Sequence, residues 1–201
     1  MRVRRRWVAS LVAAAGTGAL ATGALLETST SPTGPAAMPL PGLRIPAVGS
    51  WVRIHPARAP GFCLTEGRDR TGRCPTAVAA QRPCAEATLP RVYLEPAGED
   101  AAQIQWHHPE FGIGCLTTLL DGPGRDLLEP RDDCVEGEAT QRFRFESFGP
   151  PAAAHFRIRP VSTGQCLSLR DQDTEAGAEI VQGRCSTAAD QEFLIEPIAP
   201  P

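Results

Sequence analysis

The chain of 201 residues has no lysine and no asparagine, and its only aromatic residues are seven Phe, three Trp and one Tyr. With so few aromatic rings, Leu, Val and Ile must fill most of the interior. The sequence also lacks a nucleophile elbow, a phosphate-binding loop, a His-Glu-x-x-His motif and a Ser-His-Asp motif. We therefore predict that the protein is not an enzyme and that it needs no cofactor.

Patterns typical of metal sites are also missing. The seven cysteines include no Cys-x-x-Cys pair, which argues against a zinc site. The four histidines all fall on expected strands, and they are His55, His107, His108 and His155. Neighbours on a strand point to opposite faces, so His107 and His108 cannot both face one ion. We interpret the histidines as packing residues and predict no metal site.

One pattern of about fifty residues occurs three times in the second part of the chain. Each copy contains Gly-x-Cys-Leu or a close variant, at 61–64, 114–116 and 164–167. A proline precedes each segment and a second cysteine follows it, namely Pro56, Pro109 and Pro160, and Cys84, Cys134 and Cys185. Two copies then contain Gln-x-Phe, at 141–143 and 191–193. This period predicts three small units, at 51–99, 100–149 and 154–197, none of which can bury its apolar face alone.

Each unit is predicted to contain four short strands, because alternating apolar and polar residues are separated by Gly- and Pro-rich breaks. We expect first strands at 51–55, 104–108 and 155–159, and second strands at 62–66, 115–119 and 166–170. We expect third strands at 77–81, 126–129 and 178–182, and fourth strands at 91–94, 142–146 and 192–196. No segment of this region has the pattern of an amphipathic helix. The repeats therefore predict a single closed all-β domain at 51–201, with few exposed strand edges.

The Gly-x-Cys-Leu segments, the second cysteines and the Gln-x-aromatic ends resemble the ricin-type β-trefoil family over residues 51–197. The resemblance implies a β-trefoil of three repeats, in which the Gln-x-aromatic residue packs in the core. Repeat one departs from the family pattern, because Pro90-Arg91-Val92 replaces Gln-x-aromatic. We expect the smaller Val92 to take the place of the core aromatic residue there.

The register of the repeats pairs the two cysteines of each unit. It predicts three disulfides, Cys63–Cys84, Cys115–Cys134 and Cys166–Cys185, each worth on the order of 3 kcal/mol in the chain-entropy model. Sequence alone does not fix connectivity. Cys74 has no counterpart in the other units, and it is either a free thiol, a link to a partner or a competitor for Cys84.

The first fifty residues differ from the rest. Four arginines among residues 2–6 precede an uncharged run at 7–26, which is typical of a cleaved signal peptide or of a retained membrane anchor. Residues 27–50 are rich in Pro, Ser, Thr and Gly and are predicted to form a flexible linker. In both cases the domain would lie outside the cytoplasm, secreted or anchored, and only the N-terminal segment would contact a membrane.

Charge excludes one class of partner. Residues 51–201 contain 15 Arg and 22 Asp or Glu, a formal net charge of −7. Nucleic-acid binding needs a positive surface to face the phosphates, so we predict no nucleic-acid partner. We expect a monomer.

The resemblance also implies one shallow sugar site per repeat, built from an aspartate after Cys-Leu, an aromatic residue on the third strand and an Asn-Gln pair. Here Thr65, Thr117 and Ser168 follow Cys-Leu, while Arg82, Asp132 and Gly183 stand at the aromatic position. The Asn-Gln position holds 89–90, 140–141 and 190–191, and without asparagine no copy is complete. The retained candidates for ligand binding are Thr117, Asp132, Gln141, Ser168, Asp190 and Gln191.

Two loops offer other possibilities. The acidic loop at 170–175 carries alternating carboxylates suited to calcium, but it lacks the glycine and terminal glutamate of a full calcium loop. The loop at 66–73 carries three arginines suited to an acidic sugar or a phosphate. For both loops the simpler interpretation is a solvated turn whose charges compensate one another.

The sequence therefore favours a non-catalytic binding module for a carbohydrate or cell-envelope glycan, with an eroded family site. The first alternative is a protein-interaction or inhibitor trefoil that recognises its partner through loops. The second follows from a similarity to the extracytoplasmic end of some bacterial membrane-tethered regulators. In that case the chain would be a sensor part without a DNA-binding domain.

Overall fold

The computed structural model describes residues 49–98, 100–148 and 155–201. The strands are β1 (Ser50–Pro56), β2 (Phe62–Arg68), β3 (Ala77–Pro83), β4 (Arg91–Pro96), β5 (Ala101–His108), β6 (Gly112–Thr118), β7 (Leu128–Arg131), β8 (Phe143–Phe148), β9 (His155–Pro160), β10 (Cys166–Leu169), β11 (Ile180–Gly183) and β12 (Phe193–Pro197). Three 3-10 turns accompany them, η1 (Ala139–Gln141), η2 (Arg170–Gln172) and η3 (Ala189–Gln191). The predicted signal or anchor at 1–26, and the predicted linker up to residue 48, lie outside the described residues.

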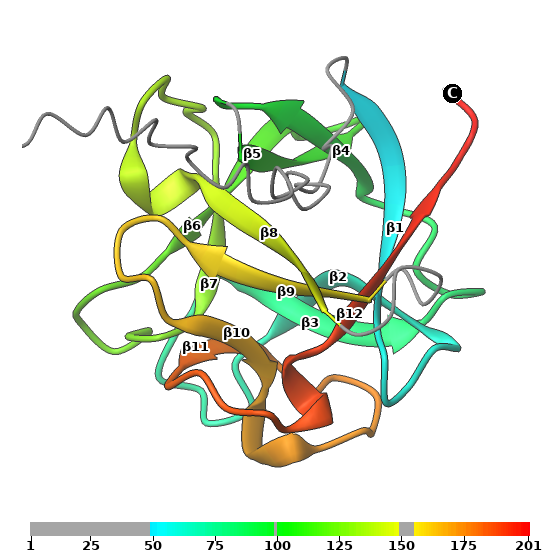
Figure 1. Cartoon of the computed structure of the whole chain (residues 1–201). Helices are drawn as coiled ribbons and strands as arrows, with labels where there is room; N and C mark the ends of the chain where they lie inside the picture. Colours follow the sequence, from blue (N-terminus) through cyan, green and yellow to red (C-terminus); the bar gives the residue numbers. More distant parts are fainter. Residues whose placement is uncertain (1–48, 99, 149–154) are drawn as a thin grey trace, which may run out of the picture. The chain divides into compact units, whose positions relative to one another are not determined.

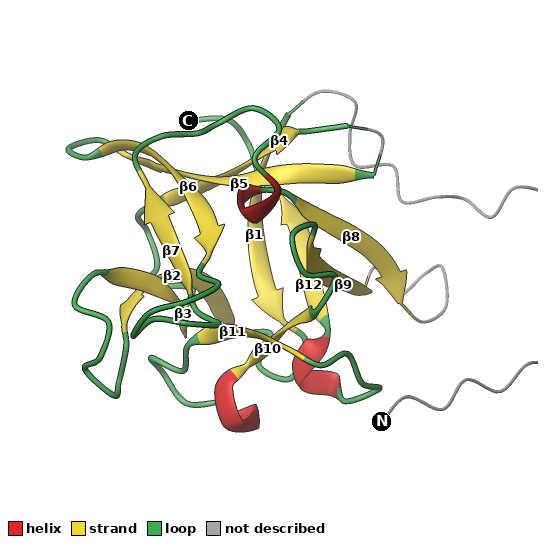
Figure 2. Ribbon diagram, turned by 90° about the vertical axis from the view of Figure 1, so that its left-hand side faces the viewer, coloured by secondary structure: helices red, strands yellow, loops and turns green. Residues whose placement is uncertain are grey.

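Six antiparallel strands close into a barrel. The order around it is β4, β1, β12, β9, β8 and β5, and pairing of β4 with β5 completes the ring. In Figures 1 and 2 the strands of this ring run in different directions because each is tilted, as twist and closure require in a small barrel. Closure leaves no free edge in this ring, as the repeats predict.

The remaining strands form one hairpin in each repeat, β2–β3, β6–β7 and β10–β11. In Figure 1, β10 and β11 lie below the barrel strands β8 and β9. The third strands of the three repeats meet at one end of the barrel, where isolated bridges join Ala80 to Glu179 and Leu127 to Val181. Twelve strands in three equivalent sets confirm the predicted β-trefoil. No helix in the described ranges has the length and apolar character needed to span a membrane.

The core fills the barrel and the inner faces of the hairpins. Along β1, Val52 and Ile54 are buried while Arg53 is exposed, which is the period-two alternation of a barrel wall. Phe143 and Phe193, the aromatic residues of the two Gln-x-Phe motifs, are fully buried. Val92 at the equivalent position of repeat one is also buried and belongs to the same core, as predicted.

The strand register corrects one part of the sequence alignment. Phe143 pairs with Pro160 and Phe193 pairs with Pro56, whereas Val92 pairs with Trp106 rather than with Pro109. Trp106, which is 3% exposed, therefore takes the position that proline holds in the other repeats. In two repeats a large Phe on the fourth strand faces a small Pro, whereas here the small Val92 faces the large Trp106. Each of the three pairs therefore supplies one bulky ring to the core.

The same register makes the hairpin between β5 and β6 longer than its counterparts. His108 pairs with Gly112 beyond the barrel, and Phe111 at the tip is 75% exposed. Matching the prolines alone missed this extension, because Pro109 lies in the turn and not at the end of the barrel strand.

The three predicted disulfides are present, Cys63–Cys84, Cys115–Cys134 and Cys166–Cys185. Each joins the second strand of a repeat to the segment that follows its third strand. Cys74 is a free, buried thiol that packs in a small second cluster with Val78 and Leu127. Since Cys84 is bonded to Cys63, Cys74 does not compete for it.

Candidate functional site

Gln141 ties together the cysteine segments of repeat two. Its side-chain amide donates to the Thr117 hydroxyl at 3.1 Å and to the Asp133 carbonyl at 2.7 Å, and its oxygen accepts from the Val135 N–H at 2.8 Å. The residue is only 2% exposed. Both amide protons and the amide oxygen are used within the protein, so Gln141 supports the loop around Cys134.

Gln191 does the same in repeat three, but less completely. Its amide donates to the Arg184 carbonyl at 2.8 Å, and its oxygen accepts from the Ser186 N–H at 2.7 Å. These two residues flank Cys185 as Asp133 and Val135 flank Cys134. The equivalent of the Thr117 contact would be Ser168, yet no hydrogen bond joins Gln191 to it among the described residues. One amide proton therefore remains available.

Two further groups in repeat three have unused hydrogen-bonding capacity. Asp190 is 7% exposed, and its Oδ1 atom is buried without a hydrogen-bond partner within the described structure. Ser168 is 8% exposed and lies on β10, which contacts the turn η3 that carries Asp190. A Cβ atom built on Gly183, at the position of the family's aromatic residue, would meet no atom within 4 Å. Among the described residues, repeat three therefore has unpaired polar groups at Ser168 and Asp190, and space for a side chain at Gly183.

In repeat two the candidates Thr117 and Gln141 contact each other, and Asp132 lies apart from them. Thr117 is buried, and its hydroxyl also donates to the Cys115 carbonyl at 3.1 Å. Asp132 is exposed and lines a shallow hollow together with Glu129, Arg131 and Asp133. The structure thus brings Thr117 to Gln141 for internal support and leaves Asp132 at the surface.

Repeat one contains a hollow that the sequence reasoning missed. Pro90 replaces the glutamine, and Thr65 donates instead to the Leu89 carbonyl at 3.2 Å. A cavity of about 240 Å³ lies at the family position, and it is lined by charged side chains, namely Glu66, Arg68, Arg82 and Glu86. The charged residues on β2, at the end of β3 and just after it are the signal that could have located this hollow.

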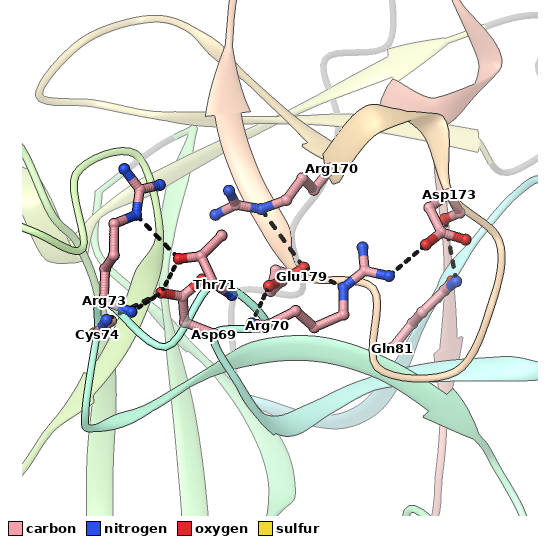
Figure 3. A network of polar contacts seen from close by, with 9 residues as sticks. All are labelled: Asp69, Arg70, Thr71, Arg73, Cys74, Gln81, Arg170, Asp173 and Glu179. Atoms are coloured by element: carbon pink, nitrogen blue, oxygen red, sulfur yellow. Dashed lines mark hydrogen bonds and ion pairs between the residues drawn. The ribbon is translucent and has the colours of Figure 1, made fainter.

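The two candidate loops face each other across repeats one and three. Figure 3 shows Arg70 from the first loop beside Glu179 and Asp173 from the second region. Its guanidinium lies 2.6 Å from the Asp173 carboxylate and 3.0 Å from that of Glu179, which is fully buried. Arg170 approaches Glu179 from the other side at 3.5 Å. The charges of these loops compensate one another, as the simpler interpretation predicts, although they do so between loops.

The pKa directions agree with this pairing. The Asp173 carboxylate holds its charge more readily, because the Glu175 N–H and then Arg70 stabilise it and lower its pKa. The contact with Asp173 raises the pKa of Arg70, with Glu179 adding to the effect. This cluster joins the first and third repeats, and it engages Arg70 of the first loop with Asp173 of the second.

Asp69 organises the loop between β2 and β3. Its carboxylate accepts from the Thr71 hydroxyl at 2.7 Å and from the N–H groups of Thr71, Arg73 and Cys74 at 3.2, 2.9 and 3.0 Å. Burial of the carboxyl raises its pKa, but these four hydrogen bonds outweigh that effect and lower it to about 2. The loop with three arginines therefore has a buried anion at its base.

The histidines lie at separate places. His107 packs against Trp51 and Tyr93, and His108 stacks on Phe111. His55 lies with Cys63 and Cys84, and the potential ligand atoms of these three residues lie within 4.8 Å of one another. The two sulfurs are bonded to each other, however, so they do not offer thiolate ligands.

A comparison of the sequence with protein families matches residues 139–200 to a model described as a ricin-type beta-trefoil lectin domain-like family. The matched segment is repeat three with the last turn and the last strand of repeat two, η1 and β8, and it contains Ser168, Gly183 and Asp190. Its pattern recurs in the other two repeats, whose strands have the same arrangement. The fold is a β-trefoil, and its third repeat is similar to the ricin-type lectin family. No curated protein matches the chain.

Several solved structures resemble most of the chain at low sequence identity. The designed threefold-symmetric protein ThreeFoil is 14% identical with a TM-score of 0.56, over 74% of this chain and 99% of that one. A mosquitocidal holotoxin is 16% identical with a TM-score of 0.61, over 75% of this chain but only 17% of the toxin. A Polyporus squamosus lectin bound to an influenza-binding epitope is 14% identical with a TM-score of 0.53, over 74% of this chain and 49% of the lectin. These likenesses establish the shared fold.

Proposed function

We propose that the protein is a non-catalytic carbohydrate-binding module whose main sugar site lies in repeat three, beside Ser168, Asp190 and Gln191. The observation that carries the proposal is the buried Asp190 Oδ1 atom, which has no hydrogen-bond partner in the described structure. A buried acceptor without a donor costs roughly 1–3 kcal/mol, and a ligand hydroxyl would supply the missing donor. The lectin domain model that covers this repeat, and the lectin among the similar structures, support the same function.

The chemistry of the three groups suits two neighbouring sugar hydroxyls. Asp190 accepts a hydrogen bond, the spare amide proton of Gln191 donates one, and the Ser168 hydroxyl does either. A hydroxyl also donates and accepts, so a diol can satisfy all three protein groups together. In repeat two the corresponding capacity is used by the contact between Gln141 and Thr117.

The site lacks an aromatic wall. Sugar sites combine a few aimed polar groups with an apolar face, and Gly183 provides no such face. We therefore expect weak binding of single sugars, in the millimolar range, with useful affinity arising from repeated glycans that several molecules contact at once.

We also propose that the domain acts outside the cytoplasm. The three disulfides are typical of proteins that fold in an oxidising compartment. A signal peptide or an anchor at 1–26 and a linker at 27–50 would place the domain there. A cell-envelope glycan is then the expected ligand.

The test is a glycan array with the oxidised full-length chain, including cell-wall fragments. We expect weak hits that Asp190→Ala removes and that Asp132→Ala, a matched change of an exposed aspartate in repeat two, leaves in place. Hits that both variants retain would locate binding elsewhere and refute the assignment to repeat three. A blank array from folded protein would refute the carbohydrate function.

One observation favours a second function, the binding of a protein. Phe111 projects from the long hairpin between β5 and β6, is 75% exposed and stacks on His108 with ring centroids 4.5 Å apart. An exposed ring held in place by a neighbour is typical of an interface anchor. A protein partner that binds wild type and Asp190→Ala but not Phe111→Ser would establish this function instead.

A further inference from the structure

Repeat one contains a second cavity, of about 240 Å³, on the barrel side of the loop that follows Cys84. Its wall is formed by β1, β4, the Cys63–Cys84 disulfide and the C-terminal segment at Ile198. Thr65, Arg82 and Leu89 of the family sugar position open into the other hollow, and Pro90 is the one residue of that position that lines this cavity.

The cavity is present where repeat one departs from the pattern of the other two. Gln141 and Gln191 fasten the segments beside the second cysteine in their repeats, but Pro90 has no side-chain amide for that purpose. Val92 is also smaller than the phenylalanines that it replaces. Trp106 on the neighbouring strand pairs with Val92 and supplies a large side chain there. Trp106 does not line the cavity, however, so it does not fill the space on the cavity side of Val92.

The walls divide into an apolar floor and a basic rim. The floor consists of apolar side chains and the disulfide, including Val52, Leu64, Pro90, Val92 and Ile198. Arg53 and Arg91 contribute the charged part of the lining, with Thr88 as the neutral polar group. No carboxylate lines the cavity. Such a site favours a molecule with an apolar body and one negative charge.

Both arginines have donors to spare. Arg91 lies over the Trp51 ring, with its Cζ atom 5.2 Å from the ring centroid, and gives one hydrogen bond of 3.1 Å to the Ala199 carbonyl. These contacts hold the guanidinium in place while leaving its other N–H groups unused. The Arg53 side chain is about half exposed and meets Glu196 only at 3.6 Å. A carboxylate is the anion that two planar guanidinium groups bind with paired hydrogen bonds.

We propose that this cavity is a binding site for a small monocarboxylic acid with an apolar body the size of a single ring. Its volume falls below the roughly 300–1,000 Å³ of pockets for drug-sized ligands, which sets that limit. The carboxylate would meet Arg53 and Arg91 while the ring lies on Val52, Val92 and Pro90. This proposal is independent of the sugar site in repeat three, since the two sites share no residue.

The test uses the oxidised full-length chain, with amide chemical shifts recorded during titration. Benzoate and cyclohexanecarboxylate are the expected ligands, benzyl alcohol tests the charge, and glucuronate tests whether an acidic sugar is the source of the carboxylate. We expect benzoate to shift amides at 52–53, 84–88 and 91–92, and benzyl alcohol to bind at least about tenfold more weakly.

Variants then separate the two parts of the site. Arg53→Gln should weaken benzoate about tenfold, and Thr88→Trp should block the entrance, while Arg131→Gln, an exposed arginine of repeat two, should change nothing. Equal binding of benzoate and benzyl alcohol, or unchanged binding by Arg53→Gln, would overturn the proposal. Stronger binding of glucuronate than of benzoate would refute the proposal that the ligand has an apolar body. Because wild-type shifts locate the ligand, the test does not depend on a variant that unfolds.

Discussion

Asp69 offers a quantitative test of how the loop between β2 and β3 is held. Its folded pKa of about 2 lies below the ordinary value of 3.8 because of the hydrogen bonds from Thr71, Arg73 and Cys74. A depressed carboxyl pKa stabilises the folded state at pH values above the unfolded pKa, and the contribution disappears as the pH falls through the folded pKa. At about 1.4 kcal/mol per pKa unit, the ionised group contributes roughly 2 kcal/mol at neutral pH.

The change Asp69→Asn keeps the size of the side chain but removes its charge and one acceptor oxygen. We expect the free energy of unfolding to fall by about 2 kcal/mol near pH 7. The difference between wild type and variant should shrink between about pH 4 and pH 2, since protonation of the wild type removes the same charge. Urea unfolding with the disulfides intact, followed by a tertiary-structure probe, measures both quantities.

Asp121→Asn is the matched control, because Asp121 is exposed. It should change the free energy of unfolding by less than about 0.5 kcal/mol at each pH. A loss from Asp69→Asn that is as small as the control, or one that persists unchanged to pH 2, would show that the charge of Asp69 does not hold the loop.

Three other changes test separate parts of the structure. Gln141→Ala should lower the free energy of unfolding by about 2–3 kcal/mol in urea denaturation, and Gln191→Ala by less, because Gln141 makes one more buried hydrogen bond. Gly183→Trp should strengthen glycan binding by about tenfold in an array or titration, since a Cβ atom at this position meets no neighbour within 4 Å and a ring would supply the missing apolar face, and no gain would argue against a sugar at this position. Arg70→Ala should lower the melting temperature, because it removes the guanidinium from a fully buried carboxylate that then keeps only Arg170 and the backbone N–H of residue 70, and a melting temperature equal to that of wild type would contradict this role.

The repeats were sufficient to predict the fold, because threefold copies restrict both topology and disulfide pairing. The pairing of Cys63, Cys115 and Cys166 follows from register alone, without any distance. The same register failed at Pro109, where the strand extends past the barrel and Trp106 takes the expected place. A single insertion in a hairpin does not change the cysteine pattern, so the sequence contains no signal that would reveal it.

The candidate site was harder to predict for a physical reason. Gln141 and Gln191 occupy the same position of the repeat. A glutamine there can either hydrogen-bond the loop around the second cysteine or contact a sugar, and both roles use its side-chain amide. What separates them is the number of protein partners of that amide, which depends on whether a threonine or a serine lies within reach. The compensating charges of Arg70 and Glu179 were likewise invisible, because they lie 109 residues apart in the chain.

The uneven loss of the family residues has a structural logic. In repeat two, the second amide proton of Gln141 is donated to the Thr117 hydroxyl. The polar groups of this site therefore bond to each other rather than to a ligand, and they stabilise the loop around Cys134. In repeat three the same amide proton and a buried carboxylate stay unpaired, which costs stability unless a ligand binds. In repeat one, Pro90 removes the amide altogether, and the space beside Val92 becomes available for a ligand of different chemistry. Glycan binding at repeat three and acid binding at repeat one are therefore expected to respond to different substitutions, and Asp190→Ala should leave the response of the protein to benzoate unchanged.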